Sequence, residues 1–196
     1  MGDIRSAREI ALEKIAQLGE ATDEERLKWK YVPEGEKLAV KYLEKSGNLI
    51  NDLKQYQEPV TGYIIAGITD ILARNISLPV DDAAGKNNRK AMEGLQMVKK
   101  DKAGLENVLS KIRHIFDHYA GQGEQQRRQT YASLKADFEA KVQQALQQQM
   151  GTAMGGNIDV EKHPQFQEEW QRMQVQLNTQ YINLLKEYKQ ELLAIP

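Results

Sequence analysis

Two histidines in this 196-residue chain have the spacing of a helical metal site. His114 and His118 lie four residues apart, so a helix would place both imidazoles on one face. Helical zinc sites combine such a pair with a third imidazole or a carboxylate. The apolar stripe of this segment lies on the opposite face, and His163 is the only other histidine. We therefore expect an exposed histidine pair without a metal, with a metal site at His114 and His118 as the alternative.

The other patterns associated with catalysis or cofactor binding are incomplete. The chain has no cysteine, which excludes thiolate nucleophiles and Cys-based metal sites. Residues 121–123 (Gly-Gln-Gly) lack the third glycine and the preceding strand of a dinucleotide-binding motif. Residues 81–88 lack the alternating ligands of a calcium loop, and Lys86 stands at the sixth position, where such a loop needs glycine. Since no nucleophile elbow or phosphate-binding loop occurs either, we expect no catalytic activity and no cofactor.

A run of basic residues raises the question of nucleic-acid binding. Six lysines and arginines fall within 17 positions: Lys86, Arg89, Lys90, Lys99, Lys100 and Lys102. Phosphate binding needs such a patch, but base stacking also needs aromatic side chains, which this segment lacks. The net charge of the whole chain is −1, so there is no general attraction to polyanions. We expect a solvated helix face here and no nucleic-acid partner.

The densest group of aromatic residues lies at positions 29–35 (Trp-Lys-Tyr-Val-Pro-Glu-Gly). Trp and Tyr are enriched at the energetic centres of protein interfaces, which makes Trp29 and Tyr31 candidate interaction residues. Aromatic residues also anchor turns, because each buries a large apolar area in a core. We favour the second interpretation, in which these aromatic side chains anchor a turn in the core.

The first part of the chain has the pattern of short helices. Apolar residues recur at three- and four-residue steps over residues 4–18, and Thr22-x-x-Glu25 has the form of a capping box. Pro33 suits the first position of a further helix. Residues 60–76 are the most apolar segment, which predicts a buried helix. We assign residues 1–79 to an N-terminal unit of short helices, with one continuous domain over both halves of the chain as the alternative.

Residues 80–196 predict long helices. One helix is expected over about residues 86–119, ended by the Gly-Gln-Gly segment. Apolar residues then repeat every 11 residues, in a first segment at Tyr131, Leu134, Phe138, Val142 and Ala145, and in a second at Phe166, Trp170, Met173, Leu177, Tyr181, Leu184, Tyr188 and Leu192. This period of about 3.67 residues per turn favours nearly straight helices. The expected fold is all-α, a helical hairpin or three-helix bundle with coiled-coil-like packing.

The loop between these two helices predicts their register. If the chain reverses symmetrically about residues 151–158, the facing pairs are Val142 with Phe166, Phe138 with Trp170, Leu134 with Met173, and Tyr131 with Leu177. Four apolar residues of the second helix then extend past its partner: Tyr181, Leu184, Tyr188 and Leu192. They need another surface, which is the 86–119 helix, the first half of the chain, or a second copy of the protein.

Two functions are compatible with these features. The first is a structural or protein-interaction protein that self-associates, because a second copy or another protein would cover the surplus apolar residues. The alternative is binding of a small molecule or lipid in an apolar cavity lined by the 60–76 helix. No segment approaches the roughly 18 apolar residues of a membrane span, and residues 1–19 carry charges spread unlike those of a targeting signal. We expect a cytoplasmic protein.

Overall fold

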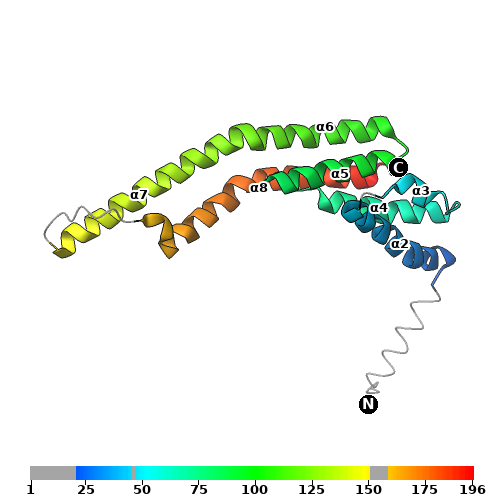
Figure 1. Cartoon of the computed structure of the whole chain (residues 1–196), viewed down its shortest axis with the longest axis horizontal. Helices are drawn as coiled ribbons and strands as arrows, with labels where there is room; N and C mark the ends of the chain where they lie inside the picture. The colour runs from blue at the N-terminus through cyan, green and yellow to red at the C-terminus, as the bar shows by residue number, and fades with distance from the viewer. Residues whose placement is uncertain (1–20, 46, 151–158) are drawn as a thin grey trace, which may run out of the picture. The chain divides into compact units, whose positions relative to one another are not determined.

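The computed structural model describes residues 21–45, 47–150 and 159–196, and within these ranges it contains helices and loops without a strand (Figure 1). This confirms the all-α class. The elements are α2 (Asp23–Lys45), α3 (Leu49–Leu53), α4 (Val60–Asn75), α5 (Asp82–Val98), α6 (Lys102–His118), η1 (Tyr119–Gly123), α7 (Glu124–Met150), η2 (Val160–Lys162) and α8 (Pro164–Ala194). The helix expected over residues 4–18 lies outside the described residues. The chain forms two compact units, Met1–Leu72 and Ala73–Pro196.

Helix α2 begins with the predicted capping box and continues through Pro33. The Thr22 backbone N–H donates to the Glu25 carboxylate at 2.8 Å, and the Glu25 N–H donates to the Thr22 hydroxyl at 3.2 Å. The prediction that a new helix starts at Pro33 is wrong, since this proline lies in the helix interior. Proline there costs about 3 kcal/mol, which is offset by tertiary burial of the turns that follow it, at Ala39 and Tyr42.

The turn expected at residues 29–35 is therefore absent, because these residues are helical. Trp29 does not anchor a core, since 65% of its surface is exposed. Tyr31 is half-buried on the same helix. The role of both residues in an interaction stays a prediction.

Two glycines allow α2 and α4 to approach closely. A Cβ atom on Gly67 would collide with the main-chain oxygen of Val32, and one on Gly35 would collide with that of Ile64. Ile64 and Ile68, which lie on α4 with Gly67, have no exposed surface. The backbone of α2 thus occupies space beside Ile64, and this contact favours close helix packing over a ligand cavity at that point.

Replacing Gly67 with alanine tests this contact. We expect Gly67→Ala to lower the free energy of unfolding by about 1–3 kcal/mol, because the new methyl group displaces one backbone from the other. The matched control is Gly62→Ala in the same helix, where the nearest atom to a Cβ is a Glu58 carboxylate oxygen at 3.9 Å. The control should be neutral or stabilising by about 0.5–1 kcal/mol. Equal effects in denaturant unfolding would contradict the close approach.

The second unit begins with a segment fixed by one buried amide. The side chain of Asn88 accepts a hydrogen bond from the Ser77 N–H at 2.8 Å and donates to the Ser77 carbonyl at 2.7 Å. Asp81 caps the start of α5 by accepting from the Ala84 N–H at 2.7 Å. The amide of Asn88 thus satisfies main-chain groups that the loop leaves outside any helix.

The single helix predicted over residues 86–119 is instead two helices. The chain leaves helical geometry at Lys99, and Asp101 caps α6 by accepting from the Gly104 N–H at 2.9 Å. The expected solvated basic face is also corrected at this corner, because Lys99 is only 6% exposed and its ammonium donates to the Ile195 carbonyl. Burial lowers the pKa of Lys99 below its ordinary value. The Pro196 oxygen accepts from the Lys100 N–H at 3.1 Å, so this corner holds the end of α8.

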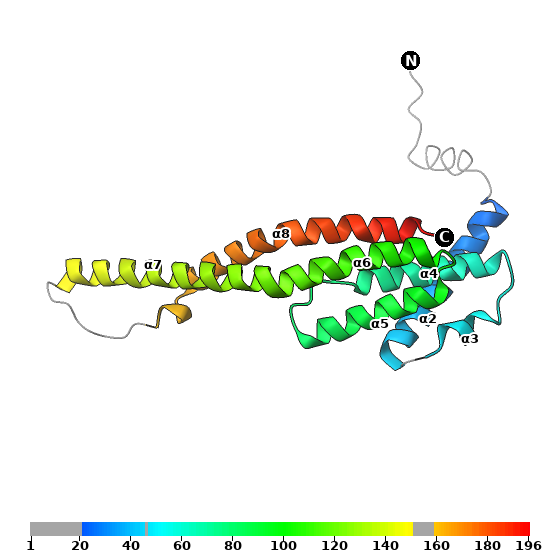
Figure 2. The same ribbon diagram turned by 90° about the horizontal axis from the view of Figure 1, so that it is seen from above.

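The glycines at 121 and 123 do not end a helix, contrary to the prediction. Residues 119–123 form a π-helical turn, and α6, η1 and α7 continue as one rod (Figure 2). Three turns of α-helix take about 11 residues, but 12 separate Tyr119 from Tyr131 along the inner face. The wider π turn absorbs the extra residue, which keeps both apolar stripes directed toward α8.

Helix α8 runs antiparallel to this rod, but the predicted register is wrong. The ring of Phe166 lies 5.4 Å from that of Phe138, where Val142 was expected. Trp170 lies 5.0 Å from Tyr131 and not beside Phe138. The rings meet edge to face, a favourable geometry for aromatic pairs. Phe166 and Trp170 thus contact residues of α7 that lie further from the 151–158 segment than a symmetric reversal of the chain predicts.

The cause is an asymmetric return of the chain. The short helix η2 lies against α7, with Val160 buried, and α8 starts only at Pro164. The ammonium of Lys135 donates to the Glu161 carboxylate at 2.5 Å. The last turns of α7 therefore extend past the start of α8, while η2 fixes where α8 begins.

The ion pair between Glu161 and Lys135 makes a pH-dependent contribution to the stability of the fold. Hydrogen bonds from Lys135 and Tyr131 lower the pKa of Glu161 below its usual 4.5. A depressed carboxylate pKa means that the stabilisation is present above about pH 4.5 and is lost as the pH falls through the folded-state pKa. We expect wild type to be more stable than Glu161→Gln near pH 7, and this difference to be smaller near pH 3. Denaturant unfolding at both pH values measures this, and a constant difference would contradict this contribution.

Candidate functional site

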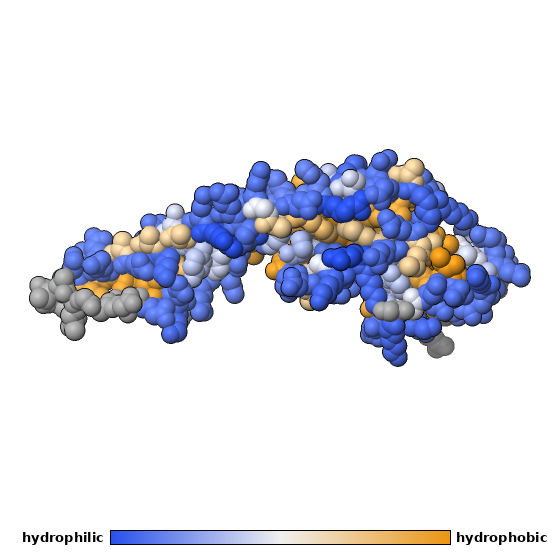
Figure 3. All heavy atoms as spheres, turned by 45° about the horizontal axis from the view of Figure 1, so that its top comes forward, coloured by the Kyte–Doolittle hydropathy of each residue, from blue (hydrophilic) through white to orange (hydrophobic). Residues whose placement is uncertain are grey.

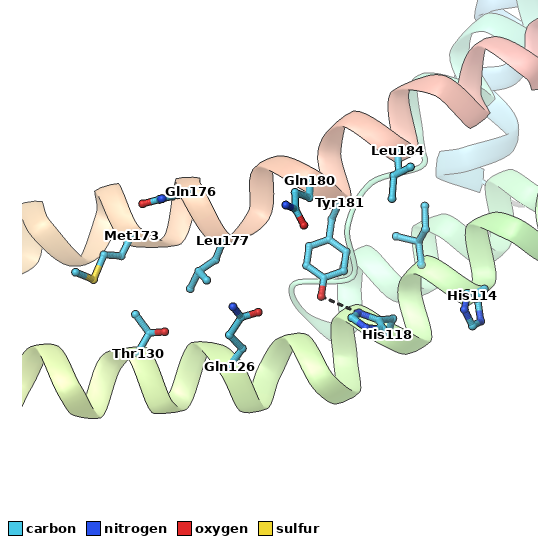
Figure 4. Close-up of a pocket in the computed structure, with 11 residues that line it drawn as sticks. His114, His118, Gln126, Thr130, Met173, Gln176, Leu177, Gln180, Tyr181 and Leu184 are labelled. Carbon is cyan, nitrogen blue, oxygen red and sulfur yellow. Dashed lines mark hydrogen bonds between the residues drawn. The ribbon is translucent and has the colours of Figure 1, made fainter.

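Aromatic and charged side chains gather at η1, where α8 lies against the rod. We call His118, Tyr119, Glu124, Arg127 and Tyr181 the π-turn cluster. The Tyr181 hydroxyl lies 2.8 Å from Nδ1 of His118 (Figure 4). The Tyr181 ring meets that of Tyr119 edge to face, with centroids 5.2 Å apart. The cluster thus joins the rod and α8 through both ring packing and a hydrogen bond.

Arg127 fixes the main chain at the π turn. Its guanidinium lies 3.9 Å from the centre of the Tyr119 ring and donates to the Tyr119 carbonyl at 3.0 Å. It also donates to the Glu124 carboxylate at 2.9 Å, and its side chain is only 13% exposed. Hydrogen bonds from Arg128 and then Arg127 lower the pKa of Glu124, which keeps this carboxylate ionised.

Gly123 provides the space that Tyr181 occupies. A Cβ atom at position 123 would lie 2.8 Å from the Tyr181 hydroxyl oxygen, whereas one at Gly121 would meet nothing within 4 Å. The two glycines of the same turn therefore differ in role. Only Gly123 is required for the contact between the rod and α8.

On one side of this cluster the seam between the rod and α8 opens into a groove of about 640 Å³, which we call the histidine groove (Figure 4). Its lining is His114, Ile115, His118, Gln126, Thr130, Met173, Gln176, Leu177, Gln180, Tyr181 and Leu184. The lining contains no carboxylate, ammonium or guanidinium group. Leu184 keeps 42% of its surface exposed at the edge of this groove. The groove thus offers apolar contacts together with amide, hydroxyl and imidazole groups that can form hydrogen bonds.

On the other side of the seam lies a second cavity of about 860 Å³, the arginine groove. It is lined by Pro79, Val80, Tyr119, Ala120, Glu124, Arg127, Arg128, Gln171, Gln174, Val175, Asn178 and Ile182. The two arginines also line an adjoining hollow of about 320 Å³ with Trp170 and Gln174. The arginine groove therefore combines charged groups near Gln174 with an apolar surface, and differs chemically from the histidine groove.

The structure places both candidate histidines at the edge of the histidine groove. His114 and His118 are exposed on α6, and His118 contacts Tyr181. In the part of the chain that the structure describes, no group of three His, Asp or Glu side chains is placed to hold a metal ion. The group that the structure places within hydrogen-bond distance of the His118 ring is the Tyr181 phenol.

The four surplus apolar residues of α8 lie along the α6 part of the rod, one of the three surfaces considered. Leu192 has no exposed surface. Tyr188 lies beneath the Lys111 ammonium, 5.2 Å from the ring centre, and Lys111 pairs with Glu191 at 2.8 Å. Leu184 is the member that stays substantially exposed, and Tyr181 belongs to the π-turn cluster.

Several residues of the site were not found from the sequence. Arg127 follows Tyr119 by eight residues, and only the π turn brings its guanidinium onto that ring. Gly123 was interpreted as a helix breaker because π turns leave no simple pattern in a sequence. The one usable signal is the change of phase between the apolar stripes on either side of residues 119–123.

The fold and its two grooves define an all-α protein in which one antiparallel helix packs along a continuous helical rod. Residues 50–194 match the family model described as a family of unknown function (DUF6657), and the chain belongs to this family. The match includes both grooves and the whole π-turn cluster. No curated protein and no solved structure matches the chain. None of the described helices is long and apolar enough to cross a membrane.

Alanine substitution at the two glycines of the π turn tests the cluster. We expect Gly123→Ala to lower the free energy of unfolding by about 1–3 kcal/mol, because the Cβ atom displaces Tyr181. Gly121→Ala, the matched control, should be neutral or slightly stabilising, since alanine favours helix by about 1 kcal/mol over glycine. Adding Tyr181→Phe to Gly123→Ala should restore part of the loss. If both glycine variants unfold alike, Tyr181 is not seated against Gly123.

Proposed function

We propose that this protein is a non-catalytic interaction protein that associates with a second copy of itself through the histidine groove. The observation that carries the proposal is the exposed Leu184 beside a groove lined by no carboxylate, ammonium or guanidinium group. The core of a protein interface is depleted of charged groups and enriched in apolar ones. The lining of this groove has no carboxylate, ammonium or guanidinium group, and it offers Ile115, Met173 and Leu177 beside Leu184 as apolar contacts.

The arm formed by α7 and the first half of α8 is only two helices thick, so the side chains between them stay partly exposed. This exposure supports a protein partner. Tyr131, Phe138, Trp170 and Met173 lie on facing sides of these two helices, yet each is only half-buried. Figure 3 shows hydrophobic atoms between the hydrophilic surfaces of this arm. A further helix laid along the seam would bury these side chains, and burial contributes about 25 cal/mol per Å² of apolar surface.

A second copy is the occupant that fits best. In a twofold dimer each groove meets the same surface of its partner, so the contact must be self-complementary. Leu184 projects at one end of the groove and Leu177 lies two turns away on the same helix. An axis near Gln180 would therefore place the exposed Leu184 of each copy beside Leu177 of the other. Because no carboxylate, ammonium or guanidinium group lines the groove, this approach brings no such groups of like charge together.

Two leucines of α8 provide a matched test. Leu184 and Leu193 are 42% and 47% exposed, but only Leu184 lines the histidine groove. We expect a dimer in sedimentation equilibrium for wild type and Leu193→Gln, and dimerisation weakened by about tenfold or more in Leu184→Gln. A monomeric wild type at high concentration, or equal behaviour of the two variants, would contradict the proposal.

A further inference from the structure

We propose that the arginine groove binds a small carboxylate with an apolar tail, of the size of a medium-chain fatty acid. This site lies on the other side of the seam from the histidine groove and does not depend on self-association. The proposal rests on an uneven set of charges, on exposed apolar side chains in line with them, and on the size of the cavity.

The charges leave one guanidinium available. Arg127 and Arg128 share the single carboxylate of Glu124, so the three side chains carry a net charge of +1. Arg127 is engaged by Glu124 and Tyr119 and is nearly buried. Among the described residues, Arg128 is bound through Nε alone, at 2.9 Å from Glu124, and its side chain is 79% exposed. Its terminal nitrogens can therefore donate to an incoming carboxylate, a charge-assisted contact.

The apolar part of the groove lies beyond these charges. Val80, Val175 and Ile182 line the groove and are 67%, 67% and 52% exposed. Val175 and Ile182 lie two helical turns apart on the same side of α8, about 10 Å along its axis. Val175 follows Gln174, which shares the adjoining hollow with both arginines. An acyl chain with its carboxylate at Arg128 can therefore extend over Val175 toward Ile182 and bury both.

The size and the polar lining fit this class of ligand. A cavity of about 860 Å³ falls within the roughly 300–1,000 Å³ typical of small-molecule sites. The side-chain amides of Gln171 and Gln174 can donate further hydrogen bonds near the carboxylate. A ligand with the same apolar tail and a cationic head group is disfavoured by the net positive charge of the groove. A ligand with a hydroxyl head group would gain no attraction from that charge.

Calorimetric titration of the full chain with decanoate, below its critical micelle concentration, tests the site. We expect decanoate to bind at least about tenfold more tightly than decanol or decyltrimethylammonium, because only the carboxylate pairs with Arg128. Acetate should bind much more weakly, because it lacks the tail. Equal affinity for decanol would overturn the role of the charge, and equal affinity for acetate would overturn the role of the apolar surface.

Variants locate the binding. Arg128→Gln and Val175→Gln change exposed side chains, so both should fold, and each should weaken decanoate binding by about tenfold. Leu184→Gln in the histidine groove is the control and should leave decanoate affinity unchanged. Loss of binding in Leu184→Gln with no effect of the other two variants would place the ligand in the histidine groove and overturn the proposal. The two grooves are lined by different residues. The decanoate proposal can therefore hold even if the protein proves to be a monomer.

Discussion

The single extra residue in the π turn is the constraint on which the second unit depends. An α-helix that continued unchanged from α6 into α7 would turn its apolar stripe away from α8 within a few turns. The wider turn at Tyr119–Gly123 removes this rotation of the stripe. The guanidinium of Arg127 holds the main chain in the geometry of that turn. One continuous rod can therefore pack against one partner helix over both of its halves, with α6 facing the end of α8 and α7 facing its beginning.

The same turn explains why both grooves lie where they do. Tyr181 projects from α8 into the space above Gly123, and its ring and that of Tyr119 fill the seam between the helices. Large aromatic side chains at one point of a seam leave room on either side of them. Opposite faces of α8 line the two grooves, and its residues alternate between them from Gln171 to Leu184. The charges of the arginine groove come from Glu124, Arg127 and Arg128 on α7.

The sequence was informative where local chemistry decides the structure and misleading where tertiary contacts override it. The capping box at Thr22 was predicted because its hydrogen bonds span only three residues. Pro33 and Gly121 were interpreted as helix boundaries, but packing of α2 on α4 and of the rod on α8 carries the helix past them. The register failed because the buried Val160 moves the start of α8, an effect that no periodicity contains. The arginine groove was not foreseen, since its lining comes from three separated segments.

The two attachments of α8 have a consequence for how the second unit comes apart. At one end the Glu161 carboxylate of η2, which leads into α8, accepts from Lys135 of α7, and at the other the Lys99 ammonium donates to the Ile195 carbonyl. A helix fastened at only one end can slip by a turn or fray progressively from the other. With both ends fastened, sliding along the rod breaks both attachments at once, and the aromatic contacts between them lose their partners together. The unit should therefore open as one cooperative element, with no stable state in which α8 is half-detached.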